Sequence, residues 1–140
     1  AVLNANYLMA RLKDDLSPSY EGPVMHEALF DDAFLKDTGV TTLDFAKAML
    51  DEGFHPMTMY FPLVVHGAFL MEPTETESKH SLDTYIAAVK TLADKAKTGD
   101  ADFFRQAPRF TPRRRLDETT AARKPVLRWT PPAPEAEAAE

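Results

Sequence analysis

Charge and proline are segregated along this sequence of 140 residues. Residues 1–104 carry 8 basic and 17 acidic side chains, a net charge of −9, whereas residues 105–128 carry 8 basic and two acidic side chains, a net charge of +6. Six of the 11 prolines lie from Pro108 onward. A segment so rich in charge and proline cannot bury enough apolar surface to offset the entropy lost on ordering. We therefore expect residues 1–104 to form the folded unit and the basic stretch to lie extended on another surface.

The last residues of the sequence are acidic. Residues 129–140 carry three Glu and no basic side chain, and they include the run PPAPEAEAAE. Such a biased composition supplies few side chains that a packed core can use. We expect a disordered acidic tail over residues 130–140.

Composition excludes several classes of protein. The chain is long enough to bury one hydrophobic core. Because it has no cysteine, it has no disulfide framework, no thiolate-bound metal and no cysteine nucleophile. No apolar run approaches the roughly 20 residues that a membrane-spanning helix needs. A formal net charge of −6 and a pI of about 5.2 argue against a general nucleic-acid-binding protein.

The sequence begins AVLNANYLMARL, which has no basic leader and no cleavage signature. We expect the chain to start inside a helix, without a secretory or transit segment. Apolar residues at helical spacing predict a helix over residues 4–16. Ser17-Pro18 should end it, because the residue before a proline is disfavoured in the α region.

A strand and a well-delimited helix follow. The run MHEALF at residues 25–30 predicts a strand. Thr41 can cap the next helix with Asp44 three residues on, a variant of the capping box. Gly53 is placed to end this helix in the left-handed conformation, and Phe54 lies where a helix-ending hydrophobic contact is common.

The second half of the folded unit has two expected strands and the longest expected helix. The strands are predicted over residues 57–63 and 68–71, and a turn is expected at residues 72–77. The long helix is expected to end at Gly99, and residues 100–106 to add one more helical turn. Its continuous apolar stripe consists of Leu82, Tyr85, Ile86, Val89, Leu92, Ala93 and Ala96. Alternating helices and strands of this kind predict an α/β or α+β fold in which helices cover a short sheet.

Few residues show the spacing of a catalytic or metal site. No glycine-rich phosphate loop and no serine nucleophile elbow is present. The histidines lack the i, i+3 or i, i+4 pairing of metal ligands, so we predict no metal site and interpret each as a polar residue at a strand or loop end: His26, His55, His66 and His80.

The segment EPTETE has two interpretations. The carboxylates of Glu72, Glu75 and Glu77 resemble a general acid–base cluster. Equally, Thr74 or Thr76 can cap the next helix while Glu77 interacts favourably with its N-terminal dipole. Spacing alone favours the capping interpretation.

The basic stretch contains the run Arg113-Arg114-Arg115 and is followed by PVLRW, which ends at Trp129. It lacks the interleaved aromatic residues of a nucleic-acid-binding segment. We interpret it as a partner-docking segment in which Trp129 is a buried anchor on a larger body.

Several long blocks resemble one known family in the right order. They are AVLNANYLMARLKDDL at 1–16, MHEALF at 25–30, GVTTLDFAKAMLDEGFHPMTMYFPLVV at 39–65, LMEPTETESKHSLD at 70–83 and RRLDETTAARKPVLRW at 114–129. The EPTETES block and the KPVLRW ending are the most distinctive. The chain resembles the C-terminal region of glycine dehydrogenase (decarboxylating) subunit 2, the P-protein of the glycine cleavage system.

The resemblance implies a pyridoxal-phosphate enzyme of the type I, aspartate-aminotransferase-like fold. In this family glycine loses its carboxylate as carbon dioxide, and the aminomethyl group passes to the lipoyl arm of the H-protein. The cofactor supplies the electron sink, and the protein supplies binding and orientation. The resemblance further implies glycine dehydrogenase subunit 1 as a partner in a heterotetramer, in the bacterial cytoplasm, without nucleic acid or membrane.

The resemblance also implies a division of the chain. In the family a lysine that follows a histidine holds the cofactor, and this sequence has no such pair because His80 comes after Lys79. We therefore expect no catalytic or cofactor-binding residue in this chain, which alone should be inactive. Residues 1–18 would be a connecting helix from a large domain, 19–104 a C-terminal small domain, and 105–129 a basic segment docked on the large domain or the partner subunit.

The residues that we place nearest the cofactor cleft or the lipoyl entrance are His55, Glu72, Thr74 and Glu75. Loop-end polarity and helix capping are the competing interpretation for each. A hypothesis of a different class is a non-catalytic module that binds a protein or RNA through residues 105–129. Salt-sensitive binding to RNA is its signature.

Overall fold

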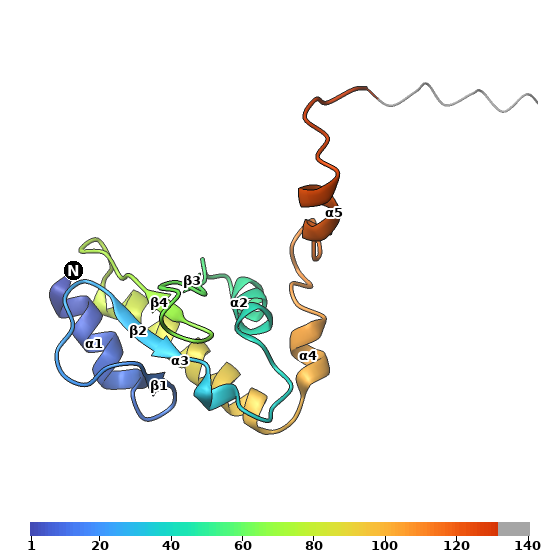
Figure 1. Cartoon of the computed structure of the whole chain (residues 1–140). Coiled ribbons are helices and arrows are strands. Elements are labelled where there is room, and N and C mark those ends of the chain that lie inside the picture. The colour runs from blue at the N-terminus through green and yellow to red at the C-terminus, as the bar shows by residue number, and fades with distance from the viewer. Residues whose placement is uncertain (132–140) are drawn as a thin grey trace, which may run out of the picture.

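The computed structural model describes residues 1–131, which fold into helices around one short sheet (Figure 1). Residues 132–140, which include most of the expected acidic tail, lie outside the described residues. In chain order the elements are α1 Val2–Leu12, β1 Ser17–Pro18, β2 Ala28–Asp31, the 3-10 helix η1 Ala33–Leu35, α2 Thr42–Asp51, β3 Thr58–Met59, β4 Phe69–Met71, α3 Lys79–Lys97, α4 Ala101–Arg105 and α5 Glu118–Arg123.

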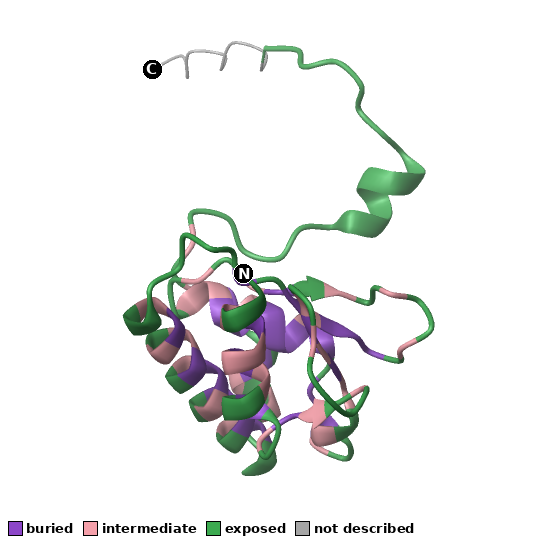
Figure 2. Cartoon of the chain, turned by 90° about the vertical axis from the view of Figure 1, so that its left-hand side faces the viewer, coloured by how far each residue is buried: buried purple, intermediate pink, exposed green. Residues whose placement is uncertain are grey.

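The four strands form one antiparallel sheet in the order β1-β2-β4-β3. Ala28 pairs with Met71 and Phe30 with Phe69, so these four buried side chains share one face of the sheet. Figure 2 shows the buried positions of the helices and strands facing inward, toward one another. The predicted fold class, a short sheet covered by helices, is confirmed.

Aromatic rings from four elements meet at the centre of the core. Phe45 of α2 lies 5.7 Å from Phe34 of η1, 5.5 Å from Phe69 of β4 and 6.0 Å from Phe104 of α4, measured between ring centroids. Phe45, Phe69 and Phe104 are fully buried. Each such ring buries a large apolar area, so this cluster joins the helices to the sheet.

The predicted start and end of α2 are confirmed. The Thr41 hydroxyl accepts the Asp44 N–H at 3.2 Å, and the Asp44 carboxylate accepts the Thr41 N–H at 3.0 Å, which completes the capping box. Gly53 has φ +84°, and Phe54 donates its N–H to the carbonyl of Met49 at 3.1 Å. Local sequence rules determine this helix because its caps lie within a few residues of its ends.

The first helix is shorter than predicted. It ends at Leu12 rather than at residue 16, because the chain turns at residues 13–15 and Ser17–Pro18 form a strand that pairs with Phe30 and Asp31 of β2. Proline is tolerated there because β1 is an edge strand. Within residues 1–131 no helix is both long and apolar enough to cross a bilayer.

Two predicted strands have different bounds. Strand pairing begins at Ala28 rather than at residue 25, because the N–H and carbonyl of Val24 bond to the side chain of Asn6 and not to a strand. The strand predicted over 57–63 is only Thr58–Met59. Tyr60 has φ +61° and Pro62 has no N–H, so the ladder stops.

The cap of α3 also differs from the prediction. Ser78 caps the helix, and neither Thr74 nor Thr76 does. The Ser78 hydroxyl accepts the backbone N–H of Ser81 at 3.1 Å. The two threonine hydroxyls instead lie 2.8 Å apart. Gly99 has φ +86° and follows the last turn, as predicted.

The first part of the basic stretch is bound to α2 of the same chain. Arg109 pairs with Asp51 at 3.2 Å and Arg115 with Asp44 at 2.7 Å. Beyond Arg115 the residues up to 131 are exposed, and six of them form α5, a helix that the sequence pattern did not predict (Figure 2). The Asp117 side chain caps α5 by accepting the Thr120 N–H at 2.9 Å.

Candidate functional site

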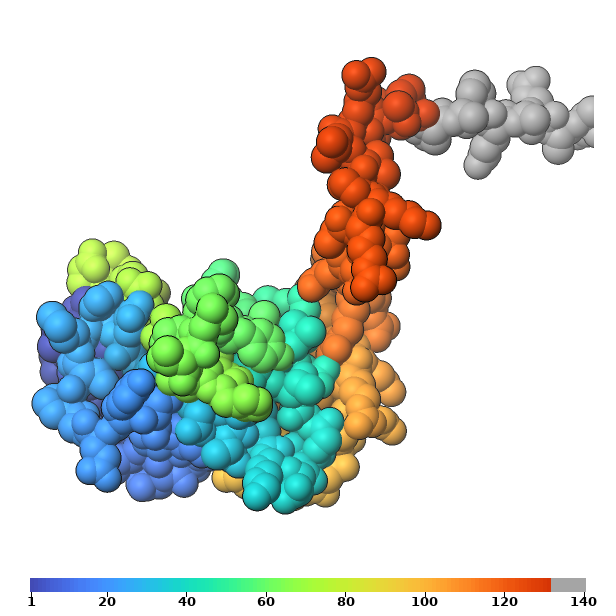
Figure 3. Space-filling view, in the orientation of Figure 1, coloured from blue at the N-terminus to red at the C-terminus, as the bar shows by residue number. Residues whose placement is uncertain are grey.

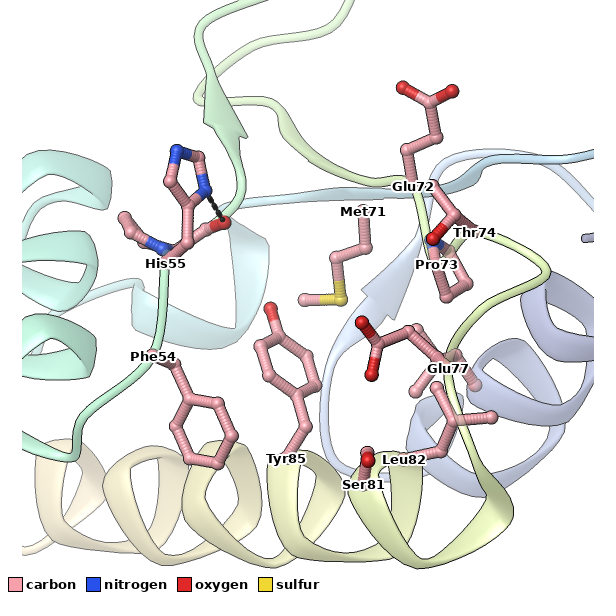
Figure 4. Close-up of a pocket in the computed structure, with 12 residues that line it drawn as sticks. Phe54, His55, Met71, Glu72, Pro73, Thr74, Glu77, Ser81, Leu82 and Tyr85 are labelled. Atoms are coloured by element: carbon pink, nitrogen blue, oxygen red, sulfur yellow. Dashed lines mark hydrogen bonds between the residues drawn. The ribbon is translucent and has the colours of Figure 1, made fainter.

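A pocket of about 330 Å³ opens between α1, α3, the end of β4 and the segment that joins α2 to β3 (Figure 4). Its volume is within the usual range for a small-molecule site. The residues that line it are Leu8, Phe54, His55, Pro56, Met71, Glu72, Pro73, Thr74, Glu77, Ser81, Leu82 and Tyr85.

Three of the four predicted site residues line this pocket. His55 reaches it from the segment after α2, and Glu72 and Thr74 reach it from the segment after β4. Glu75 is exposed and does not line it. His55 Nδ1 lies 3.1 Å from the carbonyl oxygen of Pro56, and Figure 4 shows the carboxylate of Glu72 pointing away from the cavity.

The polar groups that face the cavity most directly are those of Glu77 and Tyr85. Figure 4 shows the Tyr85 hydroxyl and the Glu77 carboxylate on either side of the end of the Met71 side chain. Burial raises the pKa of Tyr85 well above the ordinary tyrosine value. Sequence reasoning placed Tyr85 in the apolar stripe of α3 and did not use its hydroxyl. The available signal was a tyrosine, which carries a polar hydroxyl, within a stripe of otherwise apolar residues.

Asn4 holds the wall of this pocket against α1. Its side-chain Nδ2 donates to the carbonyl of Thr74 at 2.8 Å and to the carbonyl of Glu77 at 3.3 Å. These bonds connect residues 70 or more positions apart, and they satisfy two carbonyls of the turn before α3. The position of Glu77 is therefore set by tertiary contacts and by Ser78, which caps the helix.

A second, more open pocket of about 460 Å³ lies at the other end of β4, beneath the loop of residues 60–67. His66 Nδ1 lies 2.8 Å from the Asp32 carboxylate, which raises the pKa of this exposed histidine. The Tyr60 hydroxyl accepts the Leu43 N–H at 3.2 Å. Figure 3 shows the loop, in green, raised on the face of the molecule.

An imidazole and two carboxylates converge near the first pocket. His26, Glu27 and Glu72 each place a ligand atom within 4.8 Å of the others. Glu27 and Glu72 precede and follow the paired residues Ala28 and Met71. The sequence predicted no metal site because the histidines lack the i, i+3 or i, i+4 spacing of metal ligands, and Glu72 is distant in the chain from the adjacent His26 and Glu27. The antiparallel register brings them together, and no further feature of the site assigns them a metal.

Among the described residues, histidine is the one basic residue type in the linings of the two pockets, His55 in the first and His66 in the second. Neither contains a lysine or an arginine. Within residues 1–131, several lysines form ion pairs elsewhere: Lys79 with Asp83, Lys90 with Asp15 and Lys95 with Asp100. The first pocket therefore combines an apolar interior with two carboxylates, and no lysine or arginine of residues 1–131 lines it to balance the charge of an anionic ligand.

Comparison with known proteins gives one consistent family. The family described as "Glycine dehydrogenase, C-terminal domain" matches residues 1–108. A relative from Caulobacter vibrioides, named probable glycine dehydrogenase (decarboxylating) subunit 2, is 70% identical over all of this chain and 27% of its own length. Relatives of the same name from Kosmotoga olearia and Staphylococcus haemolyticus are each 52% identical, over 94% and 92% of this chain. This chain thus spans about a quarter of the length of these relatives, and it belongs to the glycine dehydrogenase C-terminal domain family.

Proposed function

We propose that this chain is the C-terminal part of a glycine decarboxylase of the glycine cleavage system, in the bacterial cytoplasm. The whole enzyme would decarboxylate glycine and pass the aminomethyl group to the lipoyl arm of the H-protein. The observation that carries this proposal is the 70% identity, over the entire chain, to a relative named glycine dehydrogenase (decarboxylating) subunit 2. Because the chain spans 27% of that relative, the activity is proposed for the longer protein.

The residues of this chain do not fit pyridoxal phosphate, the cofactor that this family implies. Enzymes of this kind hold the cofactor on a lysine. No lysine lines either pocket, and Lys79, Lys90 and Lys95 are held in ion pairs. We therefore place the cofactor on the remainder of the protein and expect the isolated chain to be inactive.

We further propose that the first pocket faces the cofactor cleft or the lipoyl entrance. Three of the residues selected from the sequence, His55, Glu72 and Thr74, come from two separate segments and line one cavity, with Glu75 beside them. The hydrogen bond between Thr74 and Thr76 supports a structural role for Thr74 in its turn as well. In the assembled enzyme these side chains would contribute to the small-domain wall of the cleft.

The end of the described chain is the segment that we propose to dock on the large domain or on glycine dehydrogenase subunit 1, in a heterotetramer. All residues from 116 to 131 are exposed, and Leu127 and Trp129 are 91% and 79% exposed. Neighbouring exposed apolar side chains, here Val126, Leu127 and Trp129, are typical of an interaction surface. Arg109 and Arg115 are already paired with carboxylates of α2, which leaves fewer free cations for binding RNA.

The proposal is tested with the full-length subunit that contains this chain. We expect it to show the absorbance of cofactor bound to a lysine, and the isolated 140-residue chain to show none. With glycine dehydrogenase subunit 1 and lipoylated H-protein, the full-length subunit should release carbon dioxide from glycine. A full-length subunit that binds no pyridoxal phosphate would overturn the proposal. Steeply salt-dependent RNA binding by the isolated chain would favour the alternative.

A further inference from the structure

The interior of the first pocket is apolar. Leu8 of α1, Phe54 and Met71 contribute to its lining, and Leu82 contributes from α3. Phe54 and Tyr85 stack edge to face with ring centroids 5.3 Å apart, which fixes the aromatic side of the cavity. Its volume of about 330 Å³ lies within the usual range for a small-molecule site. The cavity is therefore large enough for a short hydrocarbon chain.

Two polar groups in this cavity have no partner among the described residues. Glu77 is exposed and Tyr85 is half-buried, so both groups are reached from solvent. Among residues 1–131 the Glu77 carboxylate has no ion pair with a lysine, arginine or histidine, and neither it nor the Tyr85 hydroxyl has a hydrogen bond. Figure 4 shows both groups directed into the cavity, next to the Met71 side chain. A carboxylate only accepts hydrogen bonds, and a phenol oxygen accepts one as readily as it donates. Together they form a site for a group with several N–H donors.

The charge of the lining selects the sign of the ligand. Glu72 and Glu77 are at this pocket, and no lysine or arginine lines it. A carboxylate or phosphate ligand would meet the like charge of these two glutamates, with His55 as the one basic side chain among the described lining residues. A primary ammonium would donate to Glu77 and Tyr85 and lie against the Tyr85 ring, whose face attracts cations.

We propose that this pocket binds an alkylammonium group, that is, a primary ammonium carried on a short apolar chain. Glu77 and Tyr85 bind the ammonium, and the Phe54, Met71 and Leu82 side chains contact the hydrocarbon. The inference rests on the lining of the pocket and is independent of the proposed decarboxylase activity. The ammonium comes either from a free amine or from a lysine side chain that another polypeptide segment inserts.

The first experiment compares three probes of equal chain length: n-hexylamine, n-hexanol and hexanoate. The chain is labelled at its methionine methyl groups and tyrosine rings, and NMR shifts of Met71 and Tyr85 report binding at the pocket. We expect n-hexylamine to bind at least tenfold more tightly than n-hexanol, and hexanoate to bind most weakly. Hexanoate binding as tightly as n-hexylamine, or n-hexylamine shifts that leave Met71 and Tyr85 unchanged, would overturn the proposal.

Variants then assign the ammonium contact. Glu77→Gln preserves the shape of the side chain and should weaken n-hexylamine at least fivefold while leaving n-hexanol unchanged. Tyr85→Phe should weaken n-hexylamine about threefold. Glu52→Gln is the matched control, because Glu52 is exposed and lines neither pocket. Equal loss of affinity in Glu77→Gln and Glu52→Gln would refute the assignment.

A last arm distinguishes the two sources of the ammonium. Nα-acetyl-lysine methylamide imitates a lysine side chain held on a polypeptide, and its Nε-acetylated form is the uncharged control. Binding of the lysine derivative that depends on Glu77 supports docking of a lysine from a protein segment. Binding of n-hexylamine alone, with the same dependence, supports a free amine. If neither amine depends on Glu77, the proposal fails.

Discussion

Asp51 holds the start of the basic stretch on α2, and its replacement should release that stretch. The side chain is 1% exposed, and its two oxygens accept the Arg109 N–H at 2.7 and 2.9 Å, the Phe110 N–H at 3.0 Å and the Arg109 Nε–H at 3.2 Å. Asp51→Ala removes both acceptor oxygens. Asp51→Asn retains one oxygen, and its side-chain NH₂ group then faces the N–H donors of Arg109 or Phe110. Both changes leave N–H groups of the half-buried Arg109 and the exposed Phe110 without their carboxylate acceptor.

The expected loss follows from the number and burial of these bonds. Hydrogen bonds to a charged group contribute about 1.5–3 kcal/mol each, and removal of one partner of a buried ion pair costs about 3–5 kcal/mol. The Arg109 side chain is 26% exposed, so water recovers part of the loss. We expect Asp51→Ala to lower the free energy of unfolding by about 3 kcal/mol and Asp51→Asn by about 2 kcal/mol.

The same interaction predicts a pH dependence. Burial of Asp51 raises its pKa, but the Phe110 and Arg109 N–H groups and the Arg109 guanidinium outweigh burial and hold the pKa below its usual value. A carboxyl with a lowered pKa stabilises the fold fully above its unfolded pKa of about 3.9, and this stabilisation is lost as the pH falls through the folded pKa. The difference between wild type and Asp51→Asn should therefore be constant above about pH 5 and shrink below about pH 4.

Urea denaturation between pH 3 and pH 7, at roughly one-unit steps across this titration range, measures both effects. Asp14→Asn is the matched control, because Asp14 is exposed and forms no side-chain hydrogen bond or ion pair within residues 1–131. The amide resonance of Phe110 should shift in Asp51→Asn and not in the control. Equal free energies of unfolding for Asp51→Asn and Asp14→Asn at pH 7 would refute the reasoning. A difference between wild type and Asp51→Asn that is the same at pH 3 as at pH 7 would refute it as well.

Three further changes test the core, a turn and the pocket. Gly67 has a φ of +56°, and a Cβ added there would collide with the Asp32 side chain. Gly67→Ala should therefore lower the free energy of unfolding, measured in urea, by at least about 2 kcal/mol. The loss should be smaller for Gly22→Ala, because Gly22 has a φ of +96° but open space around it. Phe45→Ala empties the centre of the aromatic cluster and should cost about 3–5 kcal/mol, whereas Phe61→Ala, at a side chain that is 56% exposed, should cost under about 1 kcal/mol; similar losses would contradict the core assignment. The ultraviolet titration of Tyr85 is isolated as the difference between wild type and Tyr85→Phe, and its midpoint should lie above the ordinary tyrosine pKa of about 10. The free energy of unfolding should fall as the pH rises past that value. A midpoint at the ordinary pKa would show that the hydroxyl is not buried.

Local signals in the sequence predicted those parts of the fold whose determinants are close together. Thr41 and Asp44 form the capping box of α2, and Gly53 ends the helix, because all these contacts lie within one or two helical turns. The apolar stripe of α3 likewise predicted its buried face. The general class, helices covering a short sheet, followed from the order of these patterns.

Long-range contacts determine the features that the sequence patterns missed. Asn6 satisfies the backbone of Val24 and delays the start of β2, and no rule of spacing connects these two residues. The ion pair between Asp51 and Arg109 joins positions 58 residues apart. Sequence reasoning therefore identified the basic stretch but not the surface of α2 to which its first residues bind.

The candidate site shows the same division. The EPTETE segment indicated polar residues near one end of the sheet, and Glu72 and Thr74 do line a pocket. Tyr85 could not be assigned to that pocket from periodicity. An apolar stripe on a helix predicts which side chains are buried, but it does not predict which groups lie near the Tyr85 hydroxyl. The three-dimensional structure brings Tyr85 of α3 into one pocket with Glu77, which precedes the cap of the same helix and is held by Asn4 of α1.

We propose that this chain is the C-terminal part of a glycine decarboxylase whose cofactor lies on the rest of the protein. The most direct measurement is release of labelled carbon dioxide from carboxyl-labelled glycine, with subunit 1 and lipoylated H-protein present. The account predicts release by the full-length subunit and none by the isolated 140-residue chain or by a subunit truncated before it. Release by the isolated chain, or undiminished release by the truncated subunit, would contradict the account.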